Sequence, residues 1–110
     1  MAMTPEKKVK NKVVRLLKEY GAYYFFPASY GMGRSGVPDI VCCLQGRFIG
    51  IECKAGKNKP IPLQEKELAD IMKAGGISCV VNEDNIPELE TILTTVMSKD
   101  NNDGLIGCRL

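Results

Sequence analysis

Histidine and tryptophan are both absent from the 110 residues. Without an imidazole, the chain cannot supply a His general base, a Ser-His or Cys-His nucleophile pair, or a His-ligated metal site. The five cysteines include no Cys-x-x-Cys spacing, and Cys42 and Cys43 are adjacent. Neighbouring side chains on a strand point to opposite faces, so that pair does not suit one shared metal. We therefore expect core thiols in a reducing compartment.

Long apolar runs are also missing. No segment approaches the roughly 20 apolar residues of a membrane helix, and the Lys-rich start has no apolar signal region after it. We expect no membrane partner and a cytoplasmic location. The length suits a single domain, with residues 1–97 forming the folded unit and residues 98–110 a loosely ordered tail.

Charge is distributed unevenly along the chain. Residues 1–60 carry 11 Lys and Arg against 4 Asp and Glu, a balance of +7, whereas residues 61–110 carry 4 against 9, a balance of −5. A basic half is typical of a protein with an anionic partner such as nucleic acid. A solvated charged surface explains the same numbers equally well.

Local signals divide the chain into alternating helices and strands. Thr4 as N-cap, Pro5 and a terminating Gly21 predict a helix from about Pro5 to Tyr20. Asn85 and Glu88 form a capping-box pattern that opens a last helix. The order is α-β-β-β-α-β-α, an α/β fold with a small mixed sheet flanked by helices. Between the terminal helices we expect strands at 22–27, 40–44, 47–54 and 77–81 and a helix from about Leu63 to Gly75.

Aromatic residues gather in one short segment, with Tyr20, Tyr23, Tyr24, Phe25 and Phe26 close together. They could stack on nucleobases. We favour core packing, because aromatic side chains dominate core burial.

A hairpin brings two acids and a lysine together. If Gln45 and Gly46 are the turn, opposed positions sum to 91, so Asp39 faces Glu52 with Cβ atoms roughly 5 Å apart. Lys54 lies two residues beyond Glu52 and shares its face.

Like charges at this distance repel by roughly 3 kcal/mol at an effective dielectric constant near 20. A divalent cation removes that repulsion, and carboxylates suit Mg²⁺ or Mn²⁺. A one-residue register slip would instead leave Glu52 and Lys54 as a solvated strand end.

The segment Gly31–Gly36 matches Gly-x-Gly-x-x-Gly literally. A dinucleotide site needs this motif to open a helix, but Val37 and Pro38 lead into a strand, so we expect no nucleotide cofactor. A loop whose Arg34 or Ser35 contacts a substrate phosphate is the better functional interpretation, beside simple turn chemistry.

Pro38-Asp39 followed by Glu52-Cys53-Lys54 resembles the PD-(D/E)xK nuclease signature in residue type and order. The wider pattern resembles the small stand-alone VRR-NUC (virus-type replication-repair nuclease) domains from about Glu6 to Val81. It consists of Gly36-Val37-Pro38-Asp39, Gly46-Arg47-Phe48, Ile51-Glu52-Cys53-Lys54, Pro62-Leu63-Gln64 and Gly75-Gly76. The resemblance implies a restriction-endonuclease-like core, and the cytosol of a virus-infected or bacterial cell as its location.

The resemblance also implies a site. Asp39, Glu52 and the backbone carbonyl of Cys53 would bind Mg²⁺ or Mn²⁺, and Glu6 would reach the metal through water. Lys54 would orient or activate the attacking water. Gln64 would support the site from its helix, and Lys57 and Lys59 would meet the DNA backbone, although a solvated basic loop is equally consistent with these two.

We accordingly expect a metal-dependent endonuclease acting on branched DNA such as Holliday junctions in replication or repair, working as a homodimer. A non-catalytic nucleic-acid-binding module, or a partner-recruiting domain that docks through the acidic second half, are the alternatives. The presence of Asp39, Glu52 and Lys54 together argues against a non-catalytic module.

Overall fold

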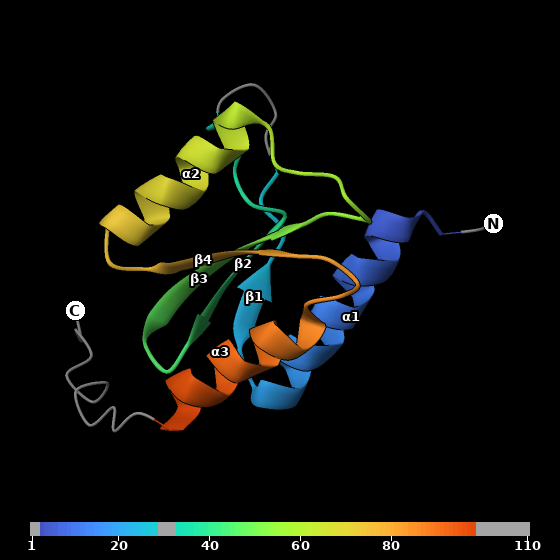
Figure 1. Cartoon of the computed structure of the whole chain (residues 1–110). Coiled ribbons are helices and arrows are strands. Elements are labelled where there is room, and N and C mark those ends of the chain that lie inside the picture. The colour runs from blue at the N-terminus through green and yellow to red at the C-terminus, as the bar shows by residue number, and fades with distance from the viewer. Residues whose placement is uncertain (1–2, 29–32, 99–110) are drawn as a thin grey trace.

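The computed structural model describes residues 3–28 and 33–98, in which three helices surround a four-stranded sheet (Figure 1). The strand order is β1-β2-β3-β4, with β1, β2 and β3 antiparallel and β4 parallel to β3. Helices α1 and α3 cover one face of the sheet and α2 lies on the other. The predicted α/β class and element order are therefore confirmed. The elements are α1 (Pro5–Tyr20), β1 (Tyr23–Phe25), β2 (Ile40–Leu44), β3 (Arg47–Cys53), α2 (Pro62–Lys73), β4 (Ile77–Val81) and α3 (Ile86–Ser98).

Helix α1 begins and ends where its capping residues predict. The Thr4 side chain accepts a hydrogen bond from the Lys7 backbone N–H at 3.2 Å, and Pro5 fills the first helical position. Gly21 takes the left-handed conformation, with φ of 76°, and its N–H reaches the last carbonyls of the helix.

The β2–β3 hairpin turns at Gln45 and Gly46, whose φ values are 50° and 80°. Two consecutive left-handed residues give the turn type that matches the twist of paired strands. The Cα partners run from Ile40–Ile51 to Leu44–Arg47, so opposed positions sum to 91 as predicted. This register excludes the one-residue slip.

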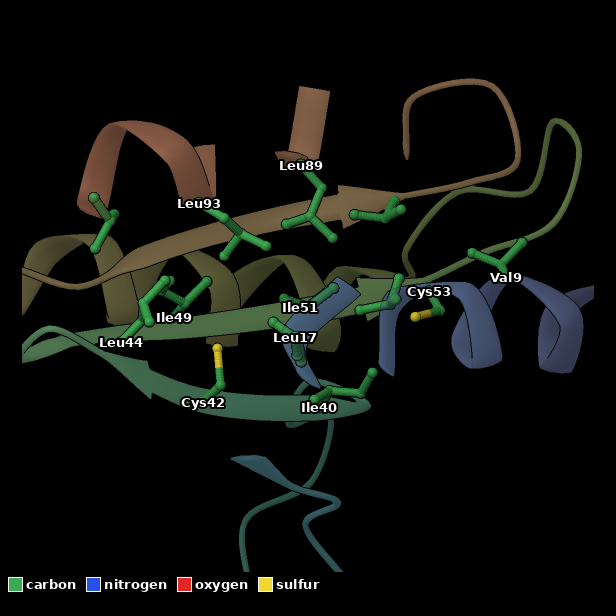
Figure 2. Close-up of a cluster of buried hydrophobic side chains, with 13 residues drawn as sticks. Val9, Leu17, Ile40, Cys42, Leu44, Ile49, Ile51, Cys53, Leu89 and Leu93 are labelled. Atoms are coloured by element: carbon green, nitrogen blue, oxygen red, sulfur yellow. The ribbon is translucent and has the colours of Figure 1, made fainter. Parts of the chain in front are cut away.

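The core lies between the sheet and the pair α1 and α3 (Figure 2). Alternate residues of β2 and β3 point into the core, because side chains alternate between the two faces of a strand. Residues three or four apart on the helices pack against them, because this spacing places side chains on one face of a helix. Burial of this apolar surface is the main force that fixes the sheet against the two helices. The thirteen members are Val9, Val13, Leu17, Ile40, Cys42, Leu44, Ile49, Ile51, Cys53, Val81, Leu89, Leu93 and Val96.

Part of the opposite face is open. Helix α2 packs mainly on β3 and β4, which leaves a groove of about 530 Å³ beside β1, and Phe25 and Phe48 line it. Tyr23, Phe25 and Phe26 have exposed fractions of 72%, 51% and 48%. Core packing was therefore the wrong interpretation for these three, which lie in or directly after β1, a three-residue strand at the edge of the sheet. Tyr24 does pack against the core.

Helix α3 starts after Asn85 as predicted, but the Asn85 side chain bonds backward. Its Oδ1 accepts from the Asn82 N–H at 2.8 Å, and its Nδ2 donates to the Val80 carbonyl at 2.9 Å. Asn85 thus fixes the loop that follows β4, which is a different use of the residue from the predicted capping box. The predicted tail boundary falls at the last turn of α3, and residues 99–110 lie outside the described part of the chain. No helix within the described ranges combines the length and apolarity needed to cross a membrane.

Candidate active site

The candidate site lies at the end of the sheet where β2 begins and β3 ends. Asp39 occupies a bend directly before Ile40, the first residue of β2. Its Oδ2 accepts a hydrogen bond from the Cys53 backbone N–H at 2.8 Å. That bond joins the Pro-Asp half of the motif to the Glu-x-Lys half. The first acid is therefore held against the backbone between the two other motif residues.

Glu52 is a buried carboxylate with one oxygen left open. The residue is 1% exposed, and its Oε1 has no hydrogen-bond partner among the residues that the structure describes. Its Oε2 lies 3.4 Å from the Nζ of Lys54, whose side chain is 14% exposed. A buried carboxylate oxygen with no partner is costly unless something else satisfies it. This geometry leaves a place for a further positive group beside Glu52.

The electrostatics of Glu52 also favour a further positive group beside it. Burial and then the neighbouring Asp39 carboxylate raise the pKa of Glu52 to about 7, while the charge and hydrogen bond of Lys54 oppose the rise. One ammonium thus offsets only part of the cost of two nearby acids. A doubly charged cation held by the two acids would offset the remainder.

The residues at this position fit a hard divalent cation. Asp39 and Glu52 provide carboxylate oxygens, which Mg²⁺ and Mn²⁺ prefer. Within the described ranges, no group of three or more Cys, Asp or Glu side chains is close enough to hold a metal. A cation here would take two carboxylates from the side chains and complete its ligands from backbone carbonyl and water, as Mg²⁺ commonly does.

A cleft of about 410 Å³, which we call the α1 cleft, connects Asp39 to the first turns of α1. Glu6, exposed on α1, lines this cleft together with Asp39. The structure thus places Glu6 on the same cleft as a motif acid, although it gives no direct contact between the two. The full lining is Thr4, Glu6, Lys7, Lys10, Asn11, Phe26 and Asp39.

Gln64 has a different local partner from the one its family position suggests. The Oε1 of Gln64 accepts a hydrogen bond from the Ile61 backbone N–H at 3.0 Å. This bond satisfies one of the free N–H groups at the start of α2. Gln64 therefore fixes the first turn of α2, and its contact is with this helix rather than with Asp39, Glu52 or Lys54.

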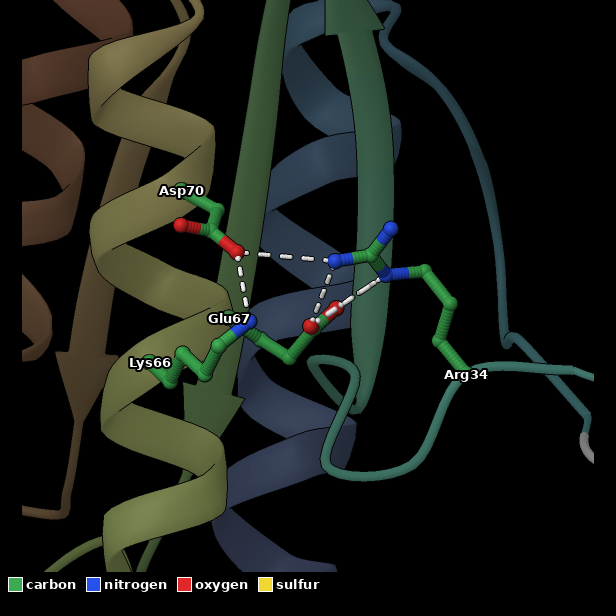
Figure 3. Close-up of polar contacts among 4 residues, drawn as sticks. All are labelled: Arg34, Lys66, Glu67 and Asp70. Atoms are coloured by element: carbon green, nitrogen blue, oxygen red, sulfur yellow. Dashed lines mark hydrogen bonds and ion pairs between the residues drawn. The ribbon is translucent and has the colours of Figure 1, made fainter.

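Arg34 pairs with α2 (Figure 3). Its Nε and Nη2 donate to the Glu67 carboxylate at 2.9 Å each, and Nη2 reaches Asp70 at 3.5 Å. Glu67 is 8% exposed, and the hydrogen bond from Arg34 lowers its pKa. Lys66 adds a bond to Asp70 at 3.2 Å. The guanidinium predicted to contact DNA is thus engaged by two carboxylates of this chain.

The other predicted nucleic-acid contacts are exposed. Ser35 lies in the loop before Asp39, and Lys57 and Lys59 lie in the loop after β3. The second loop is attached at Gly56, whose N–H donates to Glu83 at 2.6 Å. All three side chains are accessible to a ligand, and none is brought against the motif acids.

Sequence inspection missed two features of this region. The Arg34–Glu67 pair spans 33 positions, and its only sequence signal is the acidic face of α2. The second is Lys10, whose Nζ lies 4.5 Å from the centroid of the Phe26 ring on the wall of the α1 cleft. Burial and then the acids Asp39 and Glu52 raise the pKa of the Cys53 thiol to about 12, and the Lys10 charge acts against this rise. Lys10 is therefore in electrostatic reach of the motif.

The fold and the paired acids beside a lysine define a nuclease domain of the restriction-endonuclease-like class. The sequence model described as "Archaeal holliday junction resolvase (hjc)" matches residues 6–78. "Putative nuclease p44" of Acyrthosiphon pisum secondary endosymbiont phage 1 is 30% identical over 92 residues, covering 81% of this chain and 95% of the relative. A solved "VRR_NUC domain protein" shares the fold with a TM-score of 0.63 at 16% identity, covering 88% of this chain and 91% of that one.

The chain belongs to the Holliday junction resolvase (Hjc) family and shares its fold with a VRR-NUC domain. It is accordingly a DNA nuclease, a hydrolase of phosphodiester bonds. The expected recognition and fold are both confirmed.

Proposed function

We propose that this protein is a Mg²⁺- or Mn²⁺-dependent endonuclease that cuts branched DNA of the Holliday-junction type in replication or repair. The observation that carries the proposal is the buried Glu52 carboxylate, which lies beside Asp39 and Lys54 and whose Oε1 has no hydrogen-bond partner in the described part of the chain. A structural acid at this position would be expected to have both oxygens satisfied. A site built to hold a cation explains the open oxygen.

Asp39 and Glu52 would hold the cation, with the backbone carbonyl of Cys53 as a third ligand, and Glu6 would act through water from across the α1 cleft. When bound, a divalent cation supplies acidified water and neutralises charge on the phosphate. The Asp39 carboxylate is fixed by the Cys53 N–H through one oxygen, which leaves its other oxygen for the ligand role. Such prior fixing reduces the rearrangement needed when substrate arrives.

Lys54 orients the attacking water and stabilises the charge that builds on the phosphate. Its ammonium is held 3.4 Å from Glu52 and is mostly buried, so its charge acts at short range in a poorly solvated setting. Gln64 supports the site by fixing the first turn of α2 through its bond to Ile61. These roles need no imidazole, in agreement with a chain that has no histidine.

DNA contacts outside the motif come from exposed loops. Lys57 and Lys59 follow the motif directly and are free to meet backbone phosphates, and Ser35 offers a hydroxyl from the loop before Asp39. Arg34 can join them only by giving up its bonds to Glu67. A domain of 110 residues has little surface for reading base sequence, so recognition of DNA shape is the economical mode.

Branched DNA also implies two copies of the chain. One active site cuts one strand, and symmetric incision of a junction needs two sites related by a two-fold axis. We therefore propose a homodimer. Sedimentation at assay concentrations tests this separately, and a strict monomer during junction cleavage would remove the dimer while leaving the nuclease.

The deciding experiment is a panel of end-labelled DNAs (four-way junction, flap, nicked and plain duplex) incubated with Mg²⁺, Mn²⁺, Ca²⁺ or EDTA. The wild-type protein is compared with Asp39→Asn and Lys54→Ala. We expect cutting by wild type in Mg²⁺ or Mn²⁺, strongest on the junction, and none in EDTA. The cleavage activity of both variants should be lower by at least about 100-fold, as when electrostatic catalytic groups are removed.

Two results would overturn the proposal. Cutting that persists in EDTA would contradict the metal requirement, and equal cutting of junction and plain duplex would contradict the preference for branched DNA. Binding without cutting under every condition would instead support a non-catalytic binding or partner-recruiting module.

A further inference from the structure

Lys10 and Phe26 form a contact on the wall of the α1 cleft. The Lys10 Nζ lies 4.5 Å from the centroid of the Phe26 ring, and the two residues come from α1 and from the end of the aromatic segment. Tyr24 packs edge-on against the same ring with centroids 6.0 Å apart. An ammonium over an aromatic face is attracted by the ring's negative π surface. The ring therefore holds the cation at the wall of the cleft that Asp39 also lines.

The ring contact leaves the hydrogen-bond donors of the Lys10 ammonium without a partner among the described residues. Within residues 3–28 and 33–98, the ion pairs formed by lysines are those of Lys54 and Lys66, and Lys10 has no carboxylate at that distance. Glu6 lies one turn earlier on α1, where a Glu–Lys pair four residues apart would ordinarily form. A cation–π contact consumes none of the three N–H donors of a lysine. Lys10 thus presents uncommitted donors inside a cleft that it shares with a motif acid.

Phe26 is an unusual residue to leave in water. It is 48% exposed and is not a member of the core cluster. Its neighbour Tyr24 gains burial against the core, whereas Phe26 contributes to the α1 cleft. Its clearest interactions are with Lys10 and Tyr24. This set of contacts assigns the ring a role in placing the ammonium.

We propose that Lys10 is a phosphate-binding residue of the active site and that Phe26 is the positioning residue that holds it. The inference rests on the proposed function, because it takes a DNA strand as the occupant of the cleft. Lys10 binds a backbone phosphate next to the scissile one, and its compact ammonium donates to the phosphate oxygens. The positive charge offsets the repulsion between that phosphate and the acids Asp39 and Glu6.

Helix α1 offers a matched control. Lys12 is exposed and lies two positions along α1 from Lys10, about 200° around the helix axis, and it is not part of the cleft lining. The variants Lys10→Met and Lys12→Met remove the same charge and keep a similar side-chain volume. Lys10→Arg restores the charge at the cleft. Phe26→Leu removes the ring, whereas Phe26→Tyr keeps it.

DNA binding is measured in an Asp39→Asn background, so that the four-way junction stays intact, over a range of salt concentrations. Each phosphate contact contributes about 0.9 to the slope of log K against log salt concentration. Lys10→Met should make this negative slope shallower by about 1. If the parent and the variant bind equally at 1 M salt, the variant should therefore bind roughly eightfold more weakly than the parent at 0.1 M salt. Lys10→Arg should keep the parental slope. The loss of slope in Lys12→Met should be less than half of the loss in Lys10→Met.

Phe26 is tested by rescue and by a double-mutant cycle. Phe26→Leu should weaken binding, Phe26→Tyr should restore it, and Phe26→Leu should add no further loss to Lys10→Met. In the catalytically intact protein, Lys10→Met should raise KM for junction DNA several-fold while kcat changes much less. A purely structural role for Phe26 would give additive losses in the cycle.

Equal slopes for Lys10→Met and Lys12→Met would overturn the inference, and so would additive effects of Lys10 and Phe26. Both results can occur while the wild-type protein still cuts junctions in Mg²⁺, in which case the proposed function stands. If the wild-type protein binds no DNA at any salt concentration, the proposed function and this inference both fail.

Discussion

The Oδ2 atom of Asp39 accepts a hydrogen bond from the backbone N–H of Cys53 at 2.8 Å. This bond crosses from the bend before β2 to the last residue of β3, so it ties both halves of the nuclease motif into one unit. It also gives Asp39 a structural use in addition to its proposed part in holding a cation. The two uses can be separated by choosing the substitution.

Asparagine and alanine at position 39 should have different effects on stability. Asp39→Asn keeps an oxygen that can accept from the Cys53 N–H, so the free energy of unfolding should stay close to that of the wild type. Asp39→Ala leaves that N–H without a partner and should cost about 1–3 kcal/mol. Both should lose at least about 100-fold in DNA cleavage. Urea unfolding and a junction-cleavage assay provide the two measurements.

The interpretation of this bond fails if both variants unfold at the same urea concentration. In that case the 2.8 Å contact contributes nothing measurable to stability. Retained cleavage in either variant would instead count against Asp39 as a ligand.

The raised pKa of Glu52 predicts a pH dependence of stability in the absence of divalent cations. Burial and the Asp39 carboxylate raise this pKa from 4.5 to about 7, so the folded protein holds a proton that the unfolded chain releases. The stabilisation is complete below about pH 4.5 and is lost as the pH rises through about 7. By linkage, the loss is on the order of 3 kcal/mol. Chemical unfolding in EDTA at pH values from 5 to 8 measures it.

Glu52→Gln should remove this dependence, because the amide does not ionise. The matched control is Glu65→Gln on the exposed first turn of α2, which should keep the wild-type slope. A Glu52→Gln protein that loses stability with pH as steeply as the wild type would show that another group is responsible.

The Arg34–Glu67 pair should stabilise the loop that leads to Asp39. Arg34 donates to Glu67 through two nitrogens, and a lysine cannot reproduce that fork. Arg34→Lys and Glu67→Gln should therefore each lower the free energy of unfolding, and the double variant should lose less than the sum. Because the hydrogen bond from Arg34 lowers the pKa of Glu67, the coupling should be present at neutral pH and disappear as acid protonates the carboxylate.

Urea unfolding of the four proteins at pH 7 and at about pH 3 gives the coupling directly. The same variants bear on DNA contact. If Arg34 is committed to Glu67, Arg34→Met should leave the salt slope of junction binding unchanged. A slope lower by about 1 would show that Arg34 leaves α2 to bind a phosphate.

Much of the fold follows from short-range signals. Thr4, Pro5 and Gly21 mark the ends of α1 because each satisfies or omits a backbone group at one defined position. Gln45 and Gly46 fix the hairpin register, because a two-residue turn allows only one pairing of the flanking strands. That register placed Asp39 and Glu52 at the same end of the sheet.

Other features depend on which surfaces the packed elements cover. The aromatic segment is typical of core residues, yet Tyr23, Phe25 and Phe26 are exposed because they lie in or directly after β1, a short strand at the edge of the sheet. In the sequence, Arg34 suggests a residue that binds phosphate. In the structure, Glu67 of α2 lies 2.9 Å from its guanidinium and binds it instead. Neither outcome has a local cause in the sequence.

The sequence by itself determined the elements, the hairpin register and the set of acids and lysine at its open end, because capping, turn geometry and strand alternation act over a few residues. Only the tertiary structure decided that Glu52 is 1% exposed with an open oxygen, and that Lys10 lies over Phe26 in a cleft that Asp39 also lines. Burial and side-chain contacts between α1, the sheet and α2 depend on how these elements pack, and packing joins residues that no sequence spacing relates.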